Sequence, residues 1–248
     1  MYCHSPMNKD KDWFTLFQCS RPECTGICNK CQGLFQSYTF IEEQCENCGR
    51  PLLSTNQFDC GYDIHQKNYC LDCYRWKQKY PHQDLTNEAI YQYDDNLKEW
   101  LYRYKYLGDV RIANMVSNGL KHIYQKFYDF QWIILPSSPK NLIQRQFHPT
   151  QQLLQVAGIP CNELFIYIGD GKKQAQKNRQ ERMQQKQPFA VRKDCSILAN
   201  KLLIFDDVYT TGTTIMNARK AIWSYVTENQ LDCPEMKSLT LTRDIQNI

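Results

Sequence analysis

The alternation of apolar and polar positions predicts both strands and helices in the second two-thirds of the chain. Short, continuous apolar runs have the length of buried strands, and they cover residues 132–135, 164–168 and 202–205. Between these runs apolar residues recur at helical spacing, which predicts helices at residues 94–105, 112–128, 150–157 and 213–226. Strands that are apolar throughout are typical of parallel sheets, because both faces of such sheets are buried. The pattern therefore predicts an α/β fold, a parallel sheet flanked by helices.

The front of the chain has a different composition, because it is crowded with cysteine. Ten of the 13 cysteines lie in residues 1–73, and the other 175 residues contain three. A segment this short does not build an ordinary hydrophobic core without metals or disulfides. We therefore expect two domains: a small cysteine-rich, zinc-binding module of the double zinc-ribbon type over residues 1–84, and an α/β domain over residues 85–248.

Hydropathy gives no sign of export or of membrane insertion. Residues 1–10 lack the apolar core of a signal peptide. No apolar run approaches the length of about 20 residues that crosses a bilayer. We therefore expect a cytoplasmic protein. In that reducing compartment clustered cysteines are metal ligands more often than disulfides.

Three CxxC pairs organise the cysteine-rich module, at residues 28–31, 45–48 and 70–73. Each pair brings two thiolates to one metal, and two pairs complete a tetrahedral zinc site. The 21 residues between the second and third pairs match a common zinc-ribbon separation. The sequence thus predicts one structural zinc site, formed by Cys45, Cys48, Cys70 and Cys73. Four thiolates close such a site, so zinc catalysis is not expected.

The remaining pair, Cys28 and Cys31, needs further ligands, and the sequence leaves two possibilities open. Cys3 stands where the second cysteine of another CxxC pair would fall if the natural start of the protein lay a few codons upstream. Alternatively, Cys19 or Cys24 completes the site. The number of zinc ions is open for the same reason.

The most informative stretch is residues 202–214, in which an apolar strand is followed by two acids and a threonine-rich loop. Asp206 and Asp207 come directly after the strand, at the edge where α/β sheets bind ligands. The loop leads into a helix, and its N–H groups, its hydroxyls and the helix dipole together form an anion site. Carboxylates beside such a loop favour a sugar phosphate, with ribose hydroxyls on the acids directly or through Mg²⁺.

This stretch resembles the phosphoribosyl pyrophosphate (PRPP) signature of type I phosphoribosyltransferases. The resemblance implies a type I phosphoribosyltransferase-like fold and a ligand, Mg-PRPP or another ribose 5-phosphate, whose ribose hydroxyls contact Asp206 and Asp207. It further implies that the 5′-phosphate is held by Thr210, Thr211, Gly212, Thr213 and Thr214.

The order of a cysteine-rich front and this domain is similar to the ComF family, which is associated with DNA uptake in natural competence. Blocks that resemble family elements follow one another at residues 93–109, 133–139, 145–151, 176–189 and 239–243. The first block contains Lys105, which the resemblance makes a candidate phosphate contact. Two positions depart from the family pattern, because Gln146 replaces a glycine and His148 replaces an asparagine.

Positive charge is concentrated in one segment. Residues 171–193 contain eight basic residues and a single acid, whereas the whole chain has a net charge of +4. In type I transferases a flexible loop closes over the reacting centre, so the resemblance makes Arg179 and Arg182, together with Lys173, candidate contacts of the departing pyrophosphate. The same segment, with the many aromatic residues, would contact single-stranded DNA. A solvated basic helix face is the alternative explanation.

The sequence thus favours a protein of competence, DNA uptake and transformation that has a PRPP-binding, phosphoribosyltransferase-like domain and binds single-stranded DNA. It leaves open whether the protein is an enzyme with transferase turnover. One alternative is a phosphoribosyltransferase of nucleotide metabolism that acts on a small acceptor and has no DNA role. Another is a structural adaptor for a helicase-like partner in DNA uptake.

Overall fold

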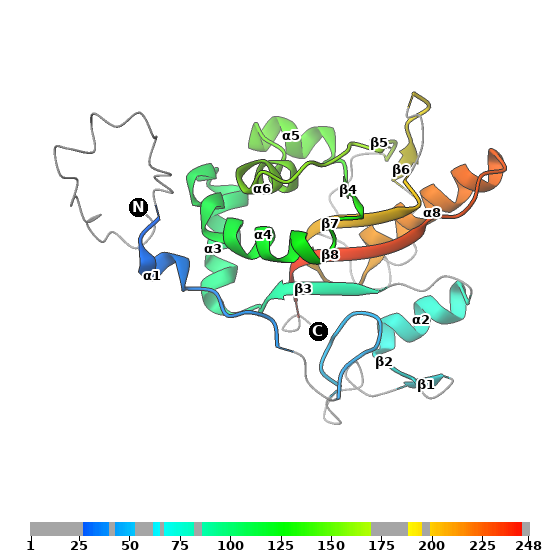
Figure 1. Ribbon diagram of the computed structural model, residues 1–248, viewed down its shortest axis with the longest axis horizontal. Helices are drawn as coiled ribbons and strands as arrows, with labels where there is room; N and C mark the ends of the chain where they lie inside the picture. Colours follow the sequence, from blue (N-terminus) through cyan, green and yellow to red (C-terminus); the bar gives the residue numbers. More distant parts are fainter. Residues whose placement is uncertain are drawn as a thin grey trace.

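The computed structural model describes residues 27–39, 43–52, 62–64, 67–81, 86–169, 188–194 and 199–244 (Figure 1). At its centre is a four-stranded sheet in which all neighbouring strands are parallel. The strand order is β3–β8–β7–β4, and the strands span Asn87–Tyr91, Glu235–Arg243, Lys201–Tyr209 and Gln131–Ile134, respectively. The predicted class, an α/β fold with a parallel sheet flanked by helices, is confirmed.

One face of the sheet packs against four helical segments: α3 (Asp95–Tyr106), the 3-10 helix η2 (Val110–Val116), α4 (Ser117–Lys126) and α6 (Pro149–Ala157). Leu203 and Phe205 of β7 share a core with Trp100 of α3. Helix α3 begins where the Asp94 carboxylate accepts a hydrogen bond of 2.8 Å from the N–H of Leu97. This side-chain cap accounts for the agreement between the predicted and the observed start of the helix.

The helix predicted over residues 112–128 is divided in two. Its first part, η2, is a 3-10 helix, and a regular α-helix begins only at Ser117. Three β-branched residues, Val110, Ile112 and Val116, lie in the 3-10 part. Such side chains lose rotamer freedom in an α-helix, so they lower its local stability while still filling the core.

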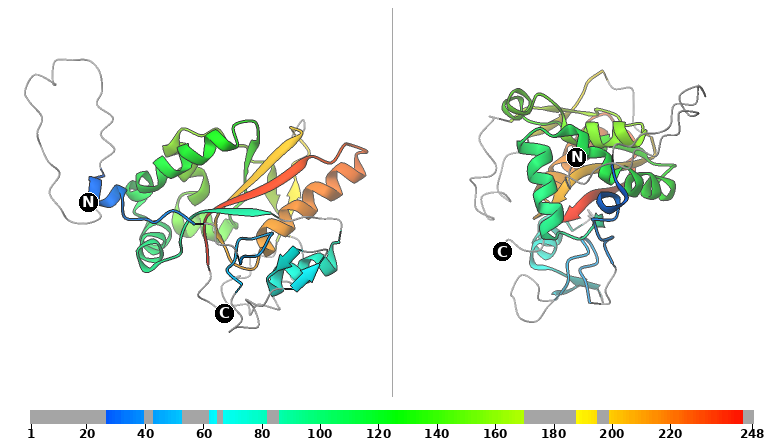
Figure 2. Two further views of the ribbon diagram at one scale, coloured as in Figure 1. Left: turned by 60° about the horizontal axis from the view of Figure 1, so that its bottom comes forward. Right: turned by 90° about the vertical axis from the view of Figure 1, so that its left-hand side faces the viewer.

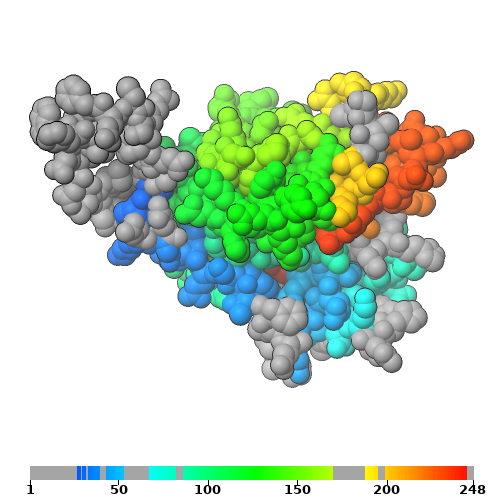
Figure 3. All heavy atoms as spheres, in the orientation of Figure 1, coloured from blue at the N-terminus to red at the C-terminus, as the bar shows by residue number. Residues whose placement is uncertain are grey.

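The other face of the sheet packs against α8 (Thr213–Glu228) and α2 (Leu71–Lys79) (Figure 2). Its core combines the cysteine-rich front with the sheet, since Cys70, Cys73 and Trp76 are buried together with Ile204 of β7 and Ile215 of α8. Figure 3 shows the blue and cyan atoms of the front along the lower side of the molecule. The boundary between two domains near residue 85 stays a prediction.

The remaining elements are short: α1 (Asn29–Gln32), β1 (Tyr62–Ile64), β2 (Lys67–Tyr69), α5 (Pro139–Arg145), β5 (Phe165–Tyr167) and β6 (Phe189–Val191). The predicted strand at residues 164–168 exists as β5, but it pairs antiparallel with β6 outside the central sheet. An apolar run predicts burial and not the pairing partner, which explains the difference. None of the helices in the described segments has the length and apolarity needed to cross a membrane.

Candidate functional site

Asp206 and Asp207 lie where the central sheet narrows. Strand β7 pairs with β4 only as far as Phe205, whereas its pairing with β8 continues to Tyr209. The apolar run predicts a strand that ends before the acids, and this is wrong, because backbone pairing with β8 extends β7 past its apolar residues. The acids still lie beyond the carboxyl end of β4, which is the edge where α/β sheets bind ligands.

Two cations act on Asp207. The Nζ of Lys105 is 2.5 Å from its Oδ2, and both side chains are largely buried. Burial disfavours both charges, but the ammonium lowers the pKa of Asp207 and the carboxylate raises the pKa of Lys105. Arg145 also lowers the pKa of Asp207, and its guanidinium lies 5.4 Å from the centroid of the Tyr106 ring. Asp207 is therefore a stably ionised carboxylate.

Asp206 has the opposite electrostatic character. Burial, followed by repulsion from Asp207, raises the pKa of Asp206 to about 7. Its Oδ1 accepts a hydrogen bond of 2.9 Å from the N–H of Asp207, which orients the carboxyl group. Near neutral pH the pair thus offers one anionic acceptor and one carboxyl group that exchanges a proton readily.

Residues 210–214, which we call the anion loop, comprise the turn after β7 and the first two residues of α8. Gly212 is the N-cap residue of α8 and has a φ angle of 75°, a conformation that favours glycine. The hydroxyl oxygens of Thr211 and Thr213 are 2.8 Å apart. Gly212 provides no side-chain hydrogen bond to cap α8, and uncapped N–H groups at the N-terminus of a helix are able to bind an anion.

Two buried side chains donate hydrogen bonds to backbone carbonyl oxygens of the anion loop. The Nη1 of Arg243 donates a hydrogen bond of 2.8 Å to the carbonyl oxygen of Thr210. The Nε1 of Trp76 donates one of 2.7 Å to the carbonyl oxygen of Thr211. Sequence reasoning assigned no role to either residue, because Trp76 on α2 and Arg243 on β8 lie far apart along the chain and only the fold brings both to the anion loop.

A second loop, residues 135–138, follows β4 and leads into α5. The hydroxyl of Ser138 accepts a hydrogen bond of 3.3 Å from the N–H of Asn141 and so caps the helix. His148 caps α6, because its Nδ1 accepts a bond of 3.4 Å from the N–H of Gln151. Burial lowers the pKa of His148, which keeps the imidazole in the neutral form that can accept this bond. Helix capping therefore explains the histidine that departs from the family pattern.

A groove of about 530 Å³ runs along α3 beside the acids and reaches Lys105. Its walls include Tyr93 and two exposed tyrosines, Tyr102 and Tyr106, whose side chains are 52% and 61% accessible. The ring centroids of the exposed pair are 5.8 Å apart. These rings offer a planar ligand an aromatic surface next to the carboxylates.

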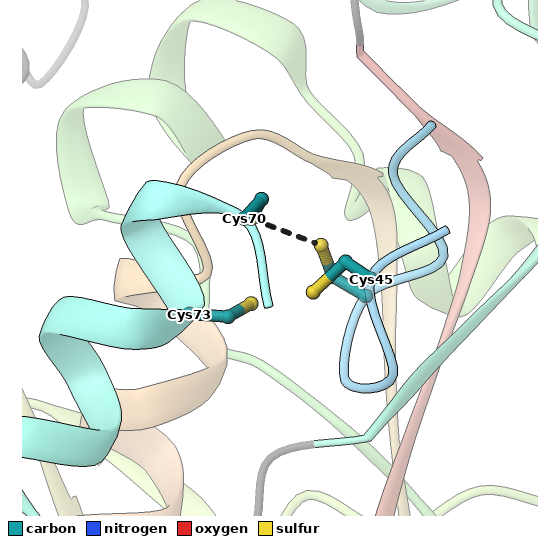
Figure 4. Close-up of side chains that lie close together, drawn as sticks. Cys45, Cys70 and Cys73 are labelled. Atoms are coloured by element: carbon teal, nitrogen blue, oxygen red, sulfur yellow. Dashed lines mark hydrogen bonds between the residues drawn. The ribbon is translucent and has the colours of Figure 1, made fainter. Parts of the chain in front are cut away.

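The four cysteines of the second and third CxxC pairs form a buried cluster. Their sulfur atoms all lie within 4.8 Å of one another: Cys45, Cys48, Cys70 and Cys73. The loop before β1 contributes the first two, and the start of α2 contributes the last two (Figure 4). Each side chain is at most 1% exposed. Four converging buried thiols could hold a metal such as zinc, for which sulfur ligands and tetrahedral geometry are characteristic.

The buried side chain of Arg243 lies beside the cysteine cluster, and its positive charge is consistent with a cluster of metal-bound thiolates. The Nε of Arg243 donates a hydrogen bond of 3.2 Å to the Sγ of Cys48. Metal-bound thiolates are negatively charged, so they accept such bonds well and compensate a buried guanidinium. The cluster and the anion loop therefore contact the same arginine.

Cys28 and Cys31 lie away from this cluster. They are joined by a backbone hydrogen bond of 2.9 Å and pack against the core that contains Phe35 and Trp100. In the part of the chain that the structure describes, the group of metal-ligating side chains that comes together is the four-cysteine cluster. Several other predicted residues lie outside the described residues, so their roles stay predictions: Cys3, Cys19, Cys24, Lys173, Arg179 and Arg182.

Two known proteins are similar to the chain over most of its length. A competence protein ComFC of Streptococcus pneumoniae is 27% identical over 217 residues, which cover 88% of this chain and 87% of that protein. A competence protein ComFC of Bacillus subtilis is 27% identical over 227 residues, covering 90% and 87%, respectively. No protein-family model matches the chain. The two similarities support the ComF family, so the family resemblance predicted from the sequence is confirmed.

Proposed function

We propose that this protein acts in natural competence and that its sheet edge binds PRPP or another ribose 5-phosphate. The observation that carries the ligand assignment is the succession of Asp206, Asp207 and the anion loop at the carboxyl edge of the sheet. The names of the two ComFC relatives support the role in competence.

The proposed ligand contacts follow from the chemistry of each group. Asp207, fixed by Lys105, accepts hydrogen bonds from the ribose hydroxyls, and Asp206 contributes a second carboxyl group. The anion loop donates N–H and hydroxyl groups to the 5′-phosphate. Mg²⁺ would neutralise the diphosphate of PRPP. Arg179 and Arg182 remain candidates for contacts with the departing pyrophosphate.

In the transferase form of this proposal, the bond between the ribose C1 and the pyrophosphate oxygen breaks as a bond to an acceptor forms. Catalysis of this kind depends on positioning and electrostatic stabilisation. No protein nucleophile is required. The sequence does not identify the acceptor. The groove lined by Tyr102 and Tyr106 is the candidate space for a planar acceptor.

Calorimetry with Mg-PRPP tests the ligand assignment. The combined substitution Asp206→Asn and Asp207→Asn should abolish the binding heat. Asp129→Asn is the matched control, because Asp129 pairs with Lys201 at the opposite end of β7 and faces solvent. Absence of binding by the intact, metal-loaded protein would contradict the proposal and favour a structural adaptor.

We further propose that the protein binds single-stranded DNA. The basic segment at residues 171–193 supports phosphate contacts, and the exposed pair Tyr102 and Tyr106 supports base stacking. Replacing Lys172, Lys173, Lys177 and Arg179 by glutamine should flatten the salt dependence of DNA binding. An unchanged slope would remove the segment from the interface. Absence of DNA binding together with PRPP binding would favour a transferase of nucleotide metabolism.

The four-cysteine cluster is proposed to hold one structural zinc ion, and the front of the chain to be a zinc-binding module that ends near residue 84. Cys28 and Cys31, with Cys3 or with Cys19 or Cys24, would form a second site. Elemental analysis of the full chain tests both assignments. One zinc per chain that is lost on Cys45→Ser supports the first site, and a second zinc that is lost on Cys28→Ser supports the other.

A further inference from the structure

Arg243, the last residue of β8, is the shared contact of the cysteine cluster and the anion loop. The side chain is 1% exposed. Its Nε donates to the Sγ of Cys48 at 3.2 Å, and its Nη1 donates to the carbonyl oxygen of Thr210 at 2.8 Å. A single planar guanidinium thus fixes the distance between the cluster and the start of the loop. The guanidinium is a rigid planar group. A shift of Cys48 would therefore move the donor that holds the carbonyl group of Thr210.

Helix α2 provides a second connection between the same two regions. Cys70 and Cys73 begin this helix, and Trp76 lies three residues further along it. The indole is 3% exposed, and it donates to the carbonyl oxygen of Thr211 at 2.7 Å. The two connections end on adjacent residues of the anion loop and start from both CxxC pairs.

Charge makes these connections dependent on the metal. A buried guanidinium is costly unless an anionic partner compensates it. Four thiolates around one divalent cation carry excess negative charge, and they hold the loop before β1 and the start of α2 together. Without the metal, both the partner of Arg243 and the crosslink that fixes α2 are weakened.

We propose that Arg243 and Trp76 are positioning residues through which metal occupancy of the four-cysteine cluster controls the geometry of the anion loop. Ligand binding at the loop, which rests on the proposed function, then requires an intact metal cluster more than 100 residues away in the sequence. The coupling itself is a property of the protein and is measured without ligand.

Hydrogen exchange of the backbone amides at residues 210–214 is the primary test, made on the full chain with its metal bound. Trp76→Phe should speed exchange in the anion loop about tenfold, because a lost hydrogen bond is worth roughly a factor of ten. Trp132→Phe is the matched control, since its indole is 2% exposed and donates to the carbonyl oxygen of Phe127 away from the loop. Equal exchange in the two variants would overturn the proposal.

Arg243→Lys keeps the positive charge but removes the planar guanidinium, whose N–H groups donate to Cys48 and Thr210 at the same time. Metal content should be unchanged, exchange in the anion loop should rise, and affinity for Mg-PRPP should fall by about tenfold. If the wild-type protein does not bind Mg-PRPP, the proposed ligand is wrong. The exchange data still decide whether the cysteine cluster and the anion loop are coupled. Unchanged exchange in the anion loop of a folded Arg243→Lys protein contradicts the coupling.

Metal removal provides a test that needs no substitution. A chelator added to the wild-type protein should increase exchange at residues 210–214 before it affects α4, which packs on the opposite face of the sheet. Loss of protection in both places at once would indicate global unfolding and count against a specific connection. Unchanged protection at residues 210–214 after metal removal would also contradict the proposed connection.

Discussion

The Nζ of Lys105 on α3 lies 2.5 Å from the Oδ2 of Asp207 on β7. The contact joins a helix that covers one face of the sheet to the strand that leads into the anion loop. It keeps Asp207 ionised in a buried position, which is the state that the proposed hydrogen bonds from ribose hydroxyls require. The electrostatic state of the site therefore depends on a residue about 100 positions earlier in the chain.

Lys105→Met should lower the free energy of unfolding by about 2–4 kcal/mol, because it leaves a buried carboxylate without its main partner. Lys126→Met is the matched control, since the Lys126–Glu88 pair is solvent-exposed and should contribute less than about 1 kcal/mol. Chemical denaturation measures both changes. The double variant Lys105→Met, Asp207→Asn should recover part of the loss, and strictly additive losses would mean that the pair is not coupled.

Asp206 should make stability depend on pH. Its pKa is raised to about 7, whereas an unfolded aspartate has a pKa of about 3.9. The folded state therefore retains a proton that the unfolded state releases, and this stabilisation is complete below about pH 4 and is lost as the pH rises through about 7. Thermal unfolding between about pH 5 and 8 should show a larger decline for the wild type than for Asp206→Asn. Parallel curves would contradict the raised pKa.

Gly212→Ala should impair the anion loop in two ways. A Cβ at a φ angle of 75° costs about 1 kcal/mol, and relaxation of that strain would displace the first turn of α8. Gly158→Ala is the control, because Gly158 has a φ angle of 69° and nothing lies near its added Cβ. Both variants should lose similar stability in denaturation, whereas phosphate-ligand binding should weaken only in Gly212→Ala. Equal binding by the two variants would exclude the loop as the contact.

Cys45→Ser should release the bound metal and lower the melting temperature by several degrees, because metal binding contributes directly to folding free energy. Cys161→Ser provides the comparison, since this half-buried cysteine lies outside the cluster. Elemental analysis and calorimetry measure the two effects on the same samples. Retention of metal and stability in Cys45→Ser would show that the cluster is not a metal site.

Prediction from sequence succeeded where the relevant contacts are local in the chain. The helix at residues 94–105 carries its own cap in Asp94, and each CxxC pair sets its own sulfur spacing. The apolar run at residues 202–205 was placed correctly, but pairing with β8 extends β7 through Tyr209. The strand β3 was not predicted, because its short sequence has neither a continuous apolar run nor a strict alternation, and its pairing with β8 is what makes it a strand.

The roles of Arg145, Trp76 and Arg243 could not be predicted in this way. Arg145 and Arg243 lie in blocks that resemble family elements, and Trp76 follows the third CxxC pair, but none of these patterns identifies the distant group on which the residue acts. Their positions depend on how α2, α5 and β8 pack around the end of β7. The sequence analysis placed Arg243 at the end of a family-like block, but the partners of this buried arginine are visible only in the fold.

The sequence by itself determined the class of the fold, the four clustered thiols and the order of acids and threonines that defines the anion loop. These features depend on local spacing, which a linear pattern records. Only the tertiary structure decided which cations surround Asp207 and that the cysteine cluster supports the anion loop. Those relationships result from side chains brought together across the core, where burial and charge compensation, rather than local spacing, select the partners.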